Sequence, residues 1–333
     1  MVVEKGATVV AWGDIRTWNS TSEVYPIFYQ DVGTIAVMQS FSLTGGGVID
    51  GQGWRWWPYG KSIHRPEMLH LSNANNVYIN DTTFRDSPSF HVEVRGSNIT
   101  ISHSRVEAGI DVCGGYEAAP NTDAFNIGGS HIHLHDLWVH NGDDCVPTNV
   151  GPGNTVTHDV LVERVHCECG TNAAVAIIGG RKSPAPGLDN NTVRDVIYRD
   201  MTVNRTGQGI GFKISEAYEN VTGQIVNVTW ENIDIMDPTR AVIYMNVYEE
   251  DASQSSCHLP SDPARPHWLT AHNITYRNIR ATTETYAGCF LCSPTRPCTG
   301  LLMDNVTVTA KGPFECFNAH GEAHDSSPEP CFA

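Results

Sequence analysis

Leucine and basic residues are scarce in this chain of 333 residues, and each scarcity excludes a class of protein. Only 12 leucines stand against 31 valines, 22 isoleucines and 28 threonines. Because β-branched residues suit pleated strands better than helices, this balance excludes an all-helical fold. The 21 Lys and Arg residues against 37 Asp and Glu residues give a net charge of −16. Neither nucleic acid nor an anionic membrane is therefore an expected partner.

Long apolar runs are also missing. No stretch approaches the about 20 consecutive apolar residues of a membrane-spanning helix, so we expect no membrane partner. The first six residues lack the basic start and the apolar core of a signal peptide, so we expect no leader within the sequence as written.

Cysteine, in contrast, is abundant. Ten cysteines are more than a reduced cytosolic protein of this composition normally carries. A zinc site would need a second, well-spaced pair of ligands, and none follows Cys167-Glu-Cys169 or the pair Cys289 and Cys292. We therefore predict disulfides rather than a metal site, which favours a secreted protein.

An eight-residue pattern recurs through most of the chain. Its first, third, sixth and eighth positions are expected to point inward, and its fifth position is polar. The copies are residues 77–84, 99–106, 132–139, 160–167, 196–203, 228–235, 274–281 and 301–308. The fifth residue is Asp or Asn in six of the eight copies, and these residues tolerate a left-handed backbone. The pattern predicts a bend between two short strands, with one face buried.

The spacing of the copies predicts how they are arranged in space. Successive copies begin between 22 and 46 residues apart, which suits stacked coils with insertions of different length. A parallel β-helix stacks such coils so that the inward residues form one core. A β-sandwich would instead space its strands about 8–12 residues apart. Because no linker divides the chain, we predict an all-β fold with one parallel β-helix domain over residues 1–333.

Three acidic residues stand at related places in two neighbouring coils. Asp123 precedes one copy of the pattern, and Asp143 and Asp144 precede the next. The 20 residues from Asp123 to Asp143 are close to one coil length, so stacking would bring three carboxylates together. Like charges held together leave one acid protonated while others are ionised, which is the division of labour in glycoside hydrolysis. A calcium site is the rival interpretation, because clustered carboxylates bind hard cations.

Five segments, in this order along the chain, resemble the motifs of a known family. They are Gly47-Val-Ile-Asp50-Gly-Gln-Gly53 with Trp56-Trp57, Asp86-Ser-Pro88-Ser-Phe-His91, Asn121-Thr-Asp123, Gly142-Asp143-Asp144-Cys145, and Arg240-Ala-Val-Ile-Tyr-Met-Asn-Val-Tyr248. The family is the polygalacturonase family, glycoside hydrolase family 28. The resemblance covers nearly the whole chain and implies a right-handed parallel β-helix. It also implies hydrolysis with inversion, without a metal or organic cofactor.

The resemblance also implies roles for individual residues. Asp143 would be the general acid that protonates the leaving glycosidic oxygen, while Asp123 and Asp144 would hold and deprotonate the attacking water. The residues expected to bind substrate are Lys213, Tyr248, Asn121 and His91.

Several cysteines match cysteines that form bridges in the family. Cys145 would tie the catalytic turn to the next coil by pairing with Cys167 or Cys169, and the sequence does not choose between them. The family's last bridges correspond to Cys298, Cys316 and Cys331.

Two departures separate this chain from a plain polygalacturonase. The family's Gly-His-Gly motif should follow Cys169, but residues 170–175 read Gly-Thr-Asn-Ala-Ala-Val and contain no histidine. The Arg-Ile-Lys motif reads Gly211-Phe-Lys213. The lost arginine matters because a guanidinium binds a carboxylate with two hydrogen bonds, whereas lysine is a point charge. Rhamnogalacturonan hydrolases of the family also lack the histidine, but they carry Asp-Glu in place of Asp143-Asp144.

The start of the chain differs from the family as well. Residues 3–10 resemble a strand that normally follows a leader and an N-terminal cap, and neither precedes them. We therefore predict that the N-terminal cap is truncated. Nine Asn-x-Ser/Thr sequons are compatible with a secreted glycoprotein, although several fall inside the repeat.

These observations together predict a secreted, monomeric glycoside hydrolase. Its expected partner is a plant or algal cell-wall polysaccharide of the pectin type, galacturonan or rhamnogalacturonan-like. The first alternative is a catalytically weak or inactive β-helical polysaccharide-binding protein, because the histidine and the arginine are missing. The second is a calcium-dependent polysaccharide lyase that uses the acidic cluster to hold the metal.

Overall fold

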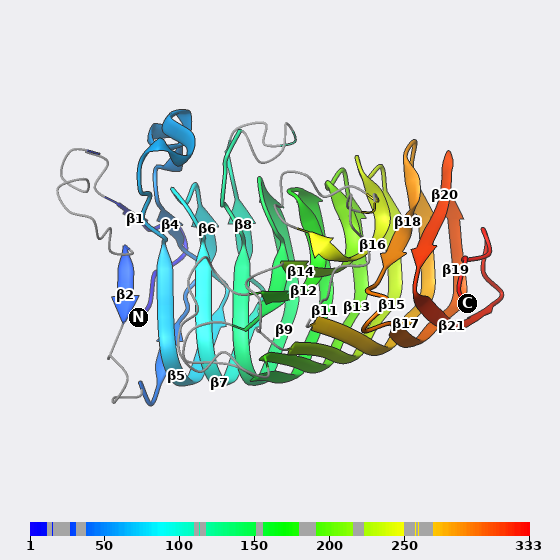
Figure 1. Cartoon of the computed structure of the whole chain (residues 1–333). Coiled ribbons are helices and arrows are strands. Elements are labelled where there is room, and N and C mark those ends of the chain that lie inside the picture. The colour runs from blue at the N-terminus through cyan, green and yellow to red at the C-terminus, as the bar shows by residue number, and fades with distance from the viewer. Residues whose placement is uncertain are drawn as a thin grey trace.

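A computed structural model shows how the chain is wound (Figure 1). The structure describes residues 1–11, 15, 27–30, 38–109, 113, 118–150, 156–179, 191–215, 223–249, 257, 259 and 269–333. The side chains of residues 29, 30, 61, 174–179, 213–215 and 249 lie outside this description.

The chain forms a right-handed parallel β-helix, which confirms the predicted fold class. Eight long strands bend as they cross from one face of a coil to the next. They are β5 (Leu69–Asn80), β7 (Val92–Ser102), β9 (Phe125–Asn141), β11 (Val156–Cys169), β13 (Asn191–Asn204), β15 (Gly223–Met236), β17 (Leu269–Thr282) and β19 (Cys298–Thr309). Successive long strands pair in parallel and lie side by side along the axis (Figure 1).

Shorter strands complete three faces of the solenoid. We call one of these faces the acid face, and the first residues of β5, β7 and β9 belong to it. The short strands on this face are β2 (Phe28–Gln30), β10 (Val146–Asn149), β12 (Asn172–Gly179), β14 (Gln208–Ser215), β16 (Ala241–Glu249), β18 (Tyr286–Leu291) and β20 (Gly312–Phe317). The face that we call the ladder face contains the central residues of the long strands with β3 (Phe41–Leu43) and β21 (Ala319–His324).

The third face and the helices are smaller. The strands β1 (Thr8–Val10), β4 (Val48–Asp50), β6 (Thr83–Arg85) and β8 (Arg105–Glu107) lie beside the last residues of the long strands from β9 onward. Two short 3-10 helices, η1 (Gly53–Arg55) and η2 (Trp57–Ser62), follow β4. No helix among the described residues is long and apolar enough to cross a membrane.

The predicted bends occur at the fifth position of every copy of the repeat. The eight residues there have φ between 48° and 57°, which is the left-handed region. They are Asp81, His103, Asp136, Arg164, Asp200, Asn232, Asn278 and Asn305. His103 and Arg164 adopt the same bend although they favour it less than Asp and Asn do, because the strands on both sides are held by parallel pairing.

Side chains at this bend form a ladder from coil to coil. The Asn232 amide donates to Asp200 (3.0 Å), the Asn278 amide donates to Asn232 (3.0 Å), and the Asn305 amide donates to Asn278 (2.9 Å). Each bond joins two successive coils, so the ladder fixes their register as well as their bend.

Inward side chains form one continuous core, as the alternation predicted. Three rings from successive coils are stacked within it. The Tyr198 and Trp230 rings lie 5.7 Å apart and the Trp230 and Tyr276 rings 5.1 Å apart, each pair within 7° of parallel. Identical positions in the coil therefore pack on one another along the axis.

All ten cysteines are paired, which confirms the prediction of disulfides over a zinc site. The bonds join Cys113 to Cys169, Cys145 to Cys167, Cys257 to Cys289, Cys292 to Cys298, and Cys316 to Cys331. The choice that the sequence left open is thus resolved, because Cys145 pairs with Cys167 and Cys169 pairs with Cys113.

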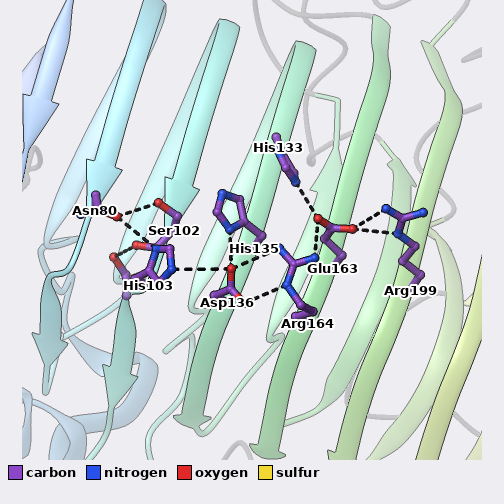
Figure 2. A network of polar contacts seen from close by, with 10 residues as sticks. Asn80, Ser102, His103, His133, His135, Asp136, Glu163, Arg164 and Arg199 are labelled. Atoms are coloured by element: carbon purple, nitrogen blue, oxygen red, sulfur yellow. Dashed lines mark hydrogen bonds and ion pairs between the residues drawn. The ribbon is translucent and has the colours of Figure 1, made fainter.

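Opposite charges are paired on the ladder face, where β9, β11 and β13 lie side by side (Figure 2). Asp136 accepts bonds from His135 Nδ1 (2.6 Å) and Arg164 Nε (2.8 Å). Glu163 accepts from Arg199 Nε (2.8 Å) and His133 Nε2 (3.1 Å), and lies 2.6 Å from Arg164 Nη1. We call these six side chains the charge network.

The charge network lowers the pKa of both of its acids. Hydrogen bonds from Arg164 and His135 hold the pKa of Asp136 well below its usual range. Desolvation raises the pKa of Glu163, but hydrogen bonds from Arg199, Arg164 and His133 outweigh it and lower the pKa to about 2.

Candidate active site

The three predicted acids lie on two turns that stack at the edge of the acid face. Asp123 is two residues before β9, and Asp143 and Asp144 precede β10. The turns are bonded to each other, since Ala124 N donates to Asp144 O (2.9 Å). One carboxylate oxygen from each acid lies within 4.8 Å of one from each of the others. The structure therefore brings together the three carboxylates that the one-coil spacing predicted.

All three carboxylates are largely withdrawn from solvent. Asp123, Asp143 and Asp144 are only 7%, 6% and 3% exposed. Three carboxyl groups therefore lie side by side where little water reaches them.

Polar groups from the next coil hold two of the acids. The Thr171 hydroxyl lies 2.7 Å from Asp143 Oδ1 and 2.5 Å from Asp144 Oδ1. The Asn172 amide donates to Asp144 Oδ1 (2.5 Å) and lies 3.3 Å from the Thr171 hydroxyl. Thr171 immediately precedes β12, and Asn172 is its first residue. The pairing of β12 with β10 holds both residues beside the acids.

Sequence reasoning missed Thr171 and Asn172. Thr171 is 28 residues after Asp143, which is about one coil, and it stands in the stretch where the family's histidine is expected. The same spacing argument that linked Asp123 to Asp143 would have found it. A threonine carries no charge and is common in this chain, so its residue type alone does not mark the position.

Asn121 lies beside the acids and is held by a cation. Its backbone N–H donates to Asp143 Oδ2 (3.1 Å), and its side-chain oxygen accepts from Arg65 Nη2 (2.8 Å). Arg65 also donates to the backbone oxygens of Pro88 and Pro120. Sequence reasoning did not find Arg65, because nothing in its surroundings in the chain marks it.

His91 contacts the Asp123 turn from inside the protein. Its ring is fully buried, and burial lowers its pKa to about 4, so the ring is neutral near pH 7. Ser87 N–H donates to Nε2 (3.2 Å), which leaves the proton on Nδ1 to be donated to Asp123 O (3.2 Å). In this arrangement His91 positions the backbone of Asp123, and its predicted contact with substrate stays a prediction.

The other two predicted binding residues follow along the same face. Tyr248 in β16 is 4% exposed and its hydroxyl donates to Cys292 O (3.2 Å). Lys213 belongs to β14, but its side chain lies outside the described residues. Substrate binding by Lys213 and Tyr248 therefore stays a prediction.

Gly211 shows why the family's arginine is absent. Its φ is +146°, and a Cβ atom at this position would lie 1.8 Å from the backbone oxygen of Tyr244 in the next coil. Real Cβ atoms never approach backbone so closely, so no residue with a side chain fits without moving β16. An arginine at this position would therefore require a change of the backbone as well as of the side chain.

Several groups of side chains among the described residues could hold a metal ion. One group of potential ligands is a disulfide pair with His140. The others are the three acids, the group of Glu67, His70 and Glu93, and the group of His103, His135 and Asp136. Asp136 is bonded by Arg164 and Glu93 is bonded by Arg95 Nε (2.9 Å), and a guanidinium repels a cation. The three acids thus remain the group best suited to hold calcium.

The family model described as glycosyl hydrolases family 28 matches residues 5–327. This chain belongs to that family. The family assignment confirms the resemblance carried by the five motifs.

Individual relatives of this family 28 chain are distant. The polygalacturonase of Chamaecyparis obtusa is 26% identical over 94% of this chain and 57% of its own length. The polygalacturonase of Nicotiana tabacum is 28% identical over 84% of this chain and 65% of its own length. The chain thus spans less than two thirds of these two relatives.

A solved structure of the family shares the fold. Endopolygalacturonase I from Stereum purpureum, determined in complex with two galacturonate, matches 98% of this chain and 90% of its own. The TM-score is 0.64 at 16% sequence identity, so the likeness concerns the fold alone.

Proposed function

We propose that this family 28 protein is a glycoside hydrolase that cleaves a pectin-type polysaccharide with inversion. The observation that carries the proposal is the convergence of three buried carboxylates on stacked turns. The family assignment and relatives named polygalacturonase support it. We propose a galacturonan or a rhamnogalacturonan-like polymer of plant or algal cell walls as the substrate.

In the proposed mechanism Asp143 is the general acid. Its proton passes to the glycosidic oxygen as the bond from that oxygen to the anomeric carbon breaks, and the leaving sugar departs as an alcohol. Asp123 and Asp144 hold a water, which attacks the anomeric carbon from the opposite side and gives a proton to one of them. Asp143 ends ionised and the base ends protonated, so the proton count is unchanged.

Inversion rests on the family and on the number of acids. Two carboxylates about 5–5.5 Å apart usually indicate retention, and inverting pairs lie about 6.5–9.5 Å apart. Here the oxygens lie within 4.8 Å, so distance alone would favour retention. A third carboxylate removes this preference for retention, because two acids can hold a water while the third protonates the leaving oxygen.

The experiment is an assay of new reducing ends on homogalacturonan, rhamnogalacturonan and xylogalacturonan. We expect one polymer to be cut, and we expect Asp143→Asn to lower turnover by about 10²–10⁴-fold while substrate is still bound. NMR of the first product released should show the inverted anomer. Equal activity in Asp143→Asn would end the assignment of the acid.

A catalytically weak polysaccharide-binding protein is the alternative that a structural observation favours. Gly211 excludes the carboxylate-clamping arginine, and the family's histidine is missing. In that case the polymers would bind without gaining reducing ends.

A calcium-dependent lyase is the other alternative, because the three acids could hold a cation. A lyase would release unsaturated, ultraviolet-absorbing ends in a chelator-sensitive way. We expect hydrolysis to be insensitive to a chelator.

We also propose that the protein is secreted and acts as a monomer. Five disulfides suit an oxidising compartment. Light scattering of the purified protein at working concentration would test its oligomeric state.

A further inference from the structure

We propose that Arg65 is a positioning residue that fixes the Pro120–Asn121 peptide, so that the N–H of this peptide is held against the carboxyl group of Asp143. The inference deepens the proposed function and rests on it for its catalytic consequence, because Asp143 is the proposed general acid. None of the five family motifs contains Arg65.

Arg65 stands at a place in its coil that recurs in the next two coils. Arg65 lies four residues before β5, Pro88 lies four residues before β7, and Asn121 lies four residues before β9. The first residues of these three strands are in register on the acid face. The side chain of Arg65 therefore starts in line with the two turns that stack beyond it along the axis.

The guanidinium of Arg65 joins these turns by three hydrogen bonds. Its Nη1 donates to Pro88 O (2.8 Å) and to Pro120 O, and its Nη2 donates to the side-chain oxygen of Asn121 (2.8 Å). A guanidinium can only donate, so it is the oxygen of the Asn121 amide that faces Arg65. The planar fork of donors spans acceptors on two turns, which the point charge of a lysine does not do.

The Pro120–Asn121 peptide connects Arg65 to Asp143. Its carbonyl oxygen accepts from Arg65 Nη1, and its N–H donates to Asp143 Oδ2 (3.1 Å). The peptide is trans, so its C=O and N–H point in opposite directions, and Arg65 and Asp143 hold it from two sides. A donor on the carbonyl oxygen also polarises the N–H at the other end of the peptide, which strengthens its bond to the carboxyl group.

The backbone at Asn121 shows what Arg65 prevents. Asn121 has a φ of 58°, a left-handed value that costs free energy even for asparagine. Turning the Pro120–Asn121 peptide over would bring this φ to a favoured negative value, but it would also point the carbonyl oxygen at Asp143 and take the donor away. Arg65 opposes this rotation because it binds the carbonyl oxygen.

Two variants of Arg65 and one control test the proposal. Arg65→Met keeps a long side chain without donors, and Arg65→Lys keeps the charge without the fork. The control is Arg105→Met in β8 on the third face. Arg105 also has structural contacts, since its Nε donates to Glu107 (3.1 Å) and its Cζ lies 4.4 Å from the centroid of the Trp138 ring.

Hydrogen exchange of backbone amides in the substrate-free protein, followed by NMR, reports on the peptide directly. We expect Arg65→Met to speed the exchange of the Asn121 N–H by about 10-fold or more, and Arg65→Lys by a smaller factor. The Ala124 N–H, which donates to Asp144 O (2.9 Å), is the internal reference and should stay within about threefold of wild type. Arg105→Met should leave both amides within about threefold.

Turnover shows the catalytic consequence. A displaced N–H affects the acid more than the binding of the polymer. We therefore expect Arg65→Met to lower kcat by about 10–100-fold with a much smaller change in KM. Arg65→Lys should lie between Arg65→Met and wild type, and Arg105→Met should keep kcat within about twofold. A rise in KM without a fall in kcat would overturn the proposal, because Arg65 would then act on substrate binding.

The exchange data separate this proposal from a general structural role. If the Asn121 N–H exchanges equally fast in Arg65→Met and wild type, the role of Arg65 is overturned whatever the activity. Equal acceleration at Asn121 and Ala124 also overturns it, because the turn then loosens as a whole. If Arg65→Met does not fold, Arg65→Lys is judged by the same criteria, and a match to wild type in both measurements overturns the need for the fork.

The proposed function fails in a different way. If the exchange of the Asn121 N–H changes as expected but the wild-type protein cuts no polysaccharide, the placement of the peptide by Arg65 stands and the proposed hydrolase function fails.

Discussion

The buried or half-buried acidic side chains of the acid face and of the ladder face have opposite kinds of neighbours. On the acid face, Asp143 and Asp144 lie beside another carboxylate and are bonded by neutral groups, the Thr171 hydroxyl and the Asn172 amide. On the ladder face, Asp136 and Glu163 are bonded by guanidinium and imidazole groups (Figure 2).

The difference lies in what each set of neighbours favours. Cationic neighbours favour the ionised form of an acid, so the charge network lowers the pKa of Asp136 and Glu163 and stabilises the fold above that range. On the acid face the acids have other carboxyl groups as neighbours, and like charges in contact do not stabilise each other. The solenoid therefore carries one face whose acids are paired with cations and one whose acids lie together, as the proposed mechanism requires.

The largest expected contrast is in turnover. We expect Asp123→Asn to lower kcat by about 10²–10⁴-fold and to leave the melting temperature unchanged or higher, because a like charge is removed. The matched variant on the ladder face, Glu163→Gln, should keep kcat within about twofold and melt earlier. Reducing-end assays and thermal melts of both variants check this, and a large loss of kcat in Glu163→Gln would break the comparison.

The next contrast concerns the disulfide at the acid face. Removing the Cys145–Cys167 bond with paired Cys→Ala changes should cost about 2–4 kcal/mol of unfolding free energy, and it should also lower kcat because the bond adjoins Asp144. Removing Cys316–Cys331 in the same way is the control, since it closes a similar loop far along the axis from the acids. Denaturant melts should show comparable losses, while kcat falls only in the first variant.

A fall in pH should reduce the contribution of the ladder face to the stability of the protein. The pKa of Glu163 is lowered to about 2 in the folded protein, against about 4.3 for a free glutamate. Its contribution to stability is therefore present above about pH 4.3 and is lost as the pH falls toward 2. We expect wild type to exceed Glu163→Gln in unfolding free energy by about 1–3 kcal/mol at pH 6, and this difference should shrink between pH 5 and pH 2. A difference that grows in acid would contradict the sign.

The smallest expected effect is the loss of unfolding free energy when the side-chain ladder at the bend is broken. Asn278→Ala should cost about 1–2 kcal/mol, because alanine is strained at this left-handed bend and the bonds to Asn232 and Asn305 are lost. Asn278→Gly loses the bonds without the strain and should cost less. Turnover should not change in either variant, and denaturant melts with the two variants side by side give the order.

Most of the fold could be predicted from the sequence because the coil is defined by local periodicity. The inward positions and the polar fifth residue recur in every copy, so the bends were expected before any contact was known. The convergence of Asp123 with Asp143 followed from the same periodicity. Such features depend only on how many residues lie between two positions.

Other parts of the site depend on contacts that spacing does not specify. Arg65 is 56 residues from Asn121, a separation that the spacing of the repeat does not single out. Cys145 had two partners at nearly equal distance along the chain, and packing decided between Cys167 and Cys169. The ring of His91 lies beneath the Asp123 turn, a contact that the sequence did not predict because the alternation of a strand does not hold in the turn before it.

Gly211 has a consequence for how this protein can change over evolutionary time. The position conflicts with any Cβ atom because the backbone of Tyr244 occupies the space. A single codon change to arginine would therefore be selected against for folding before it could be tested for binding. An arginine at this position would therefore have to arise together with a backbone shift in the neighbouring coil, or after one.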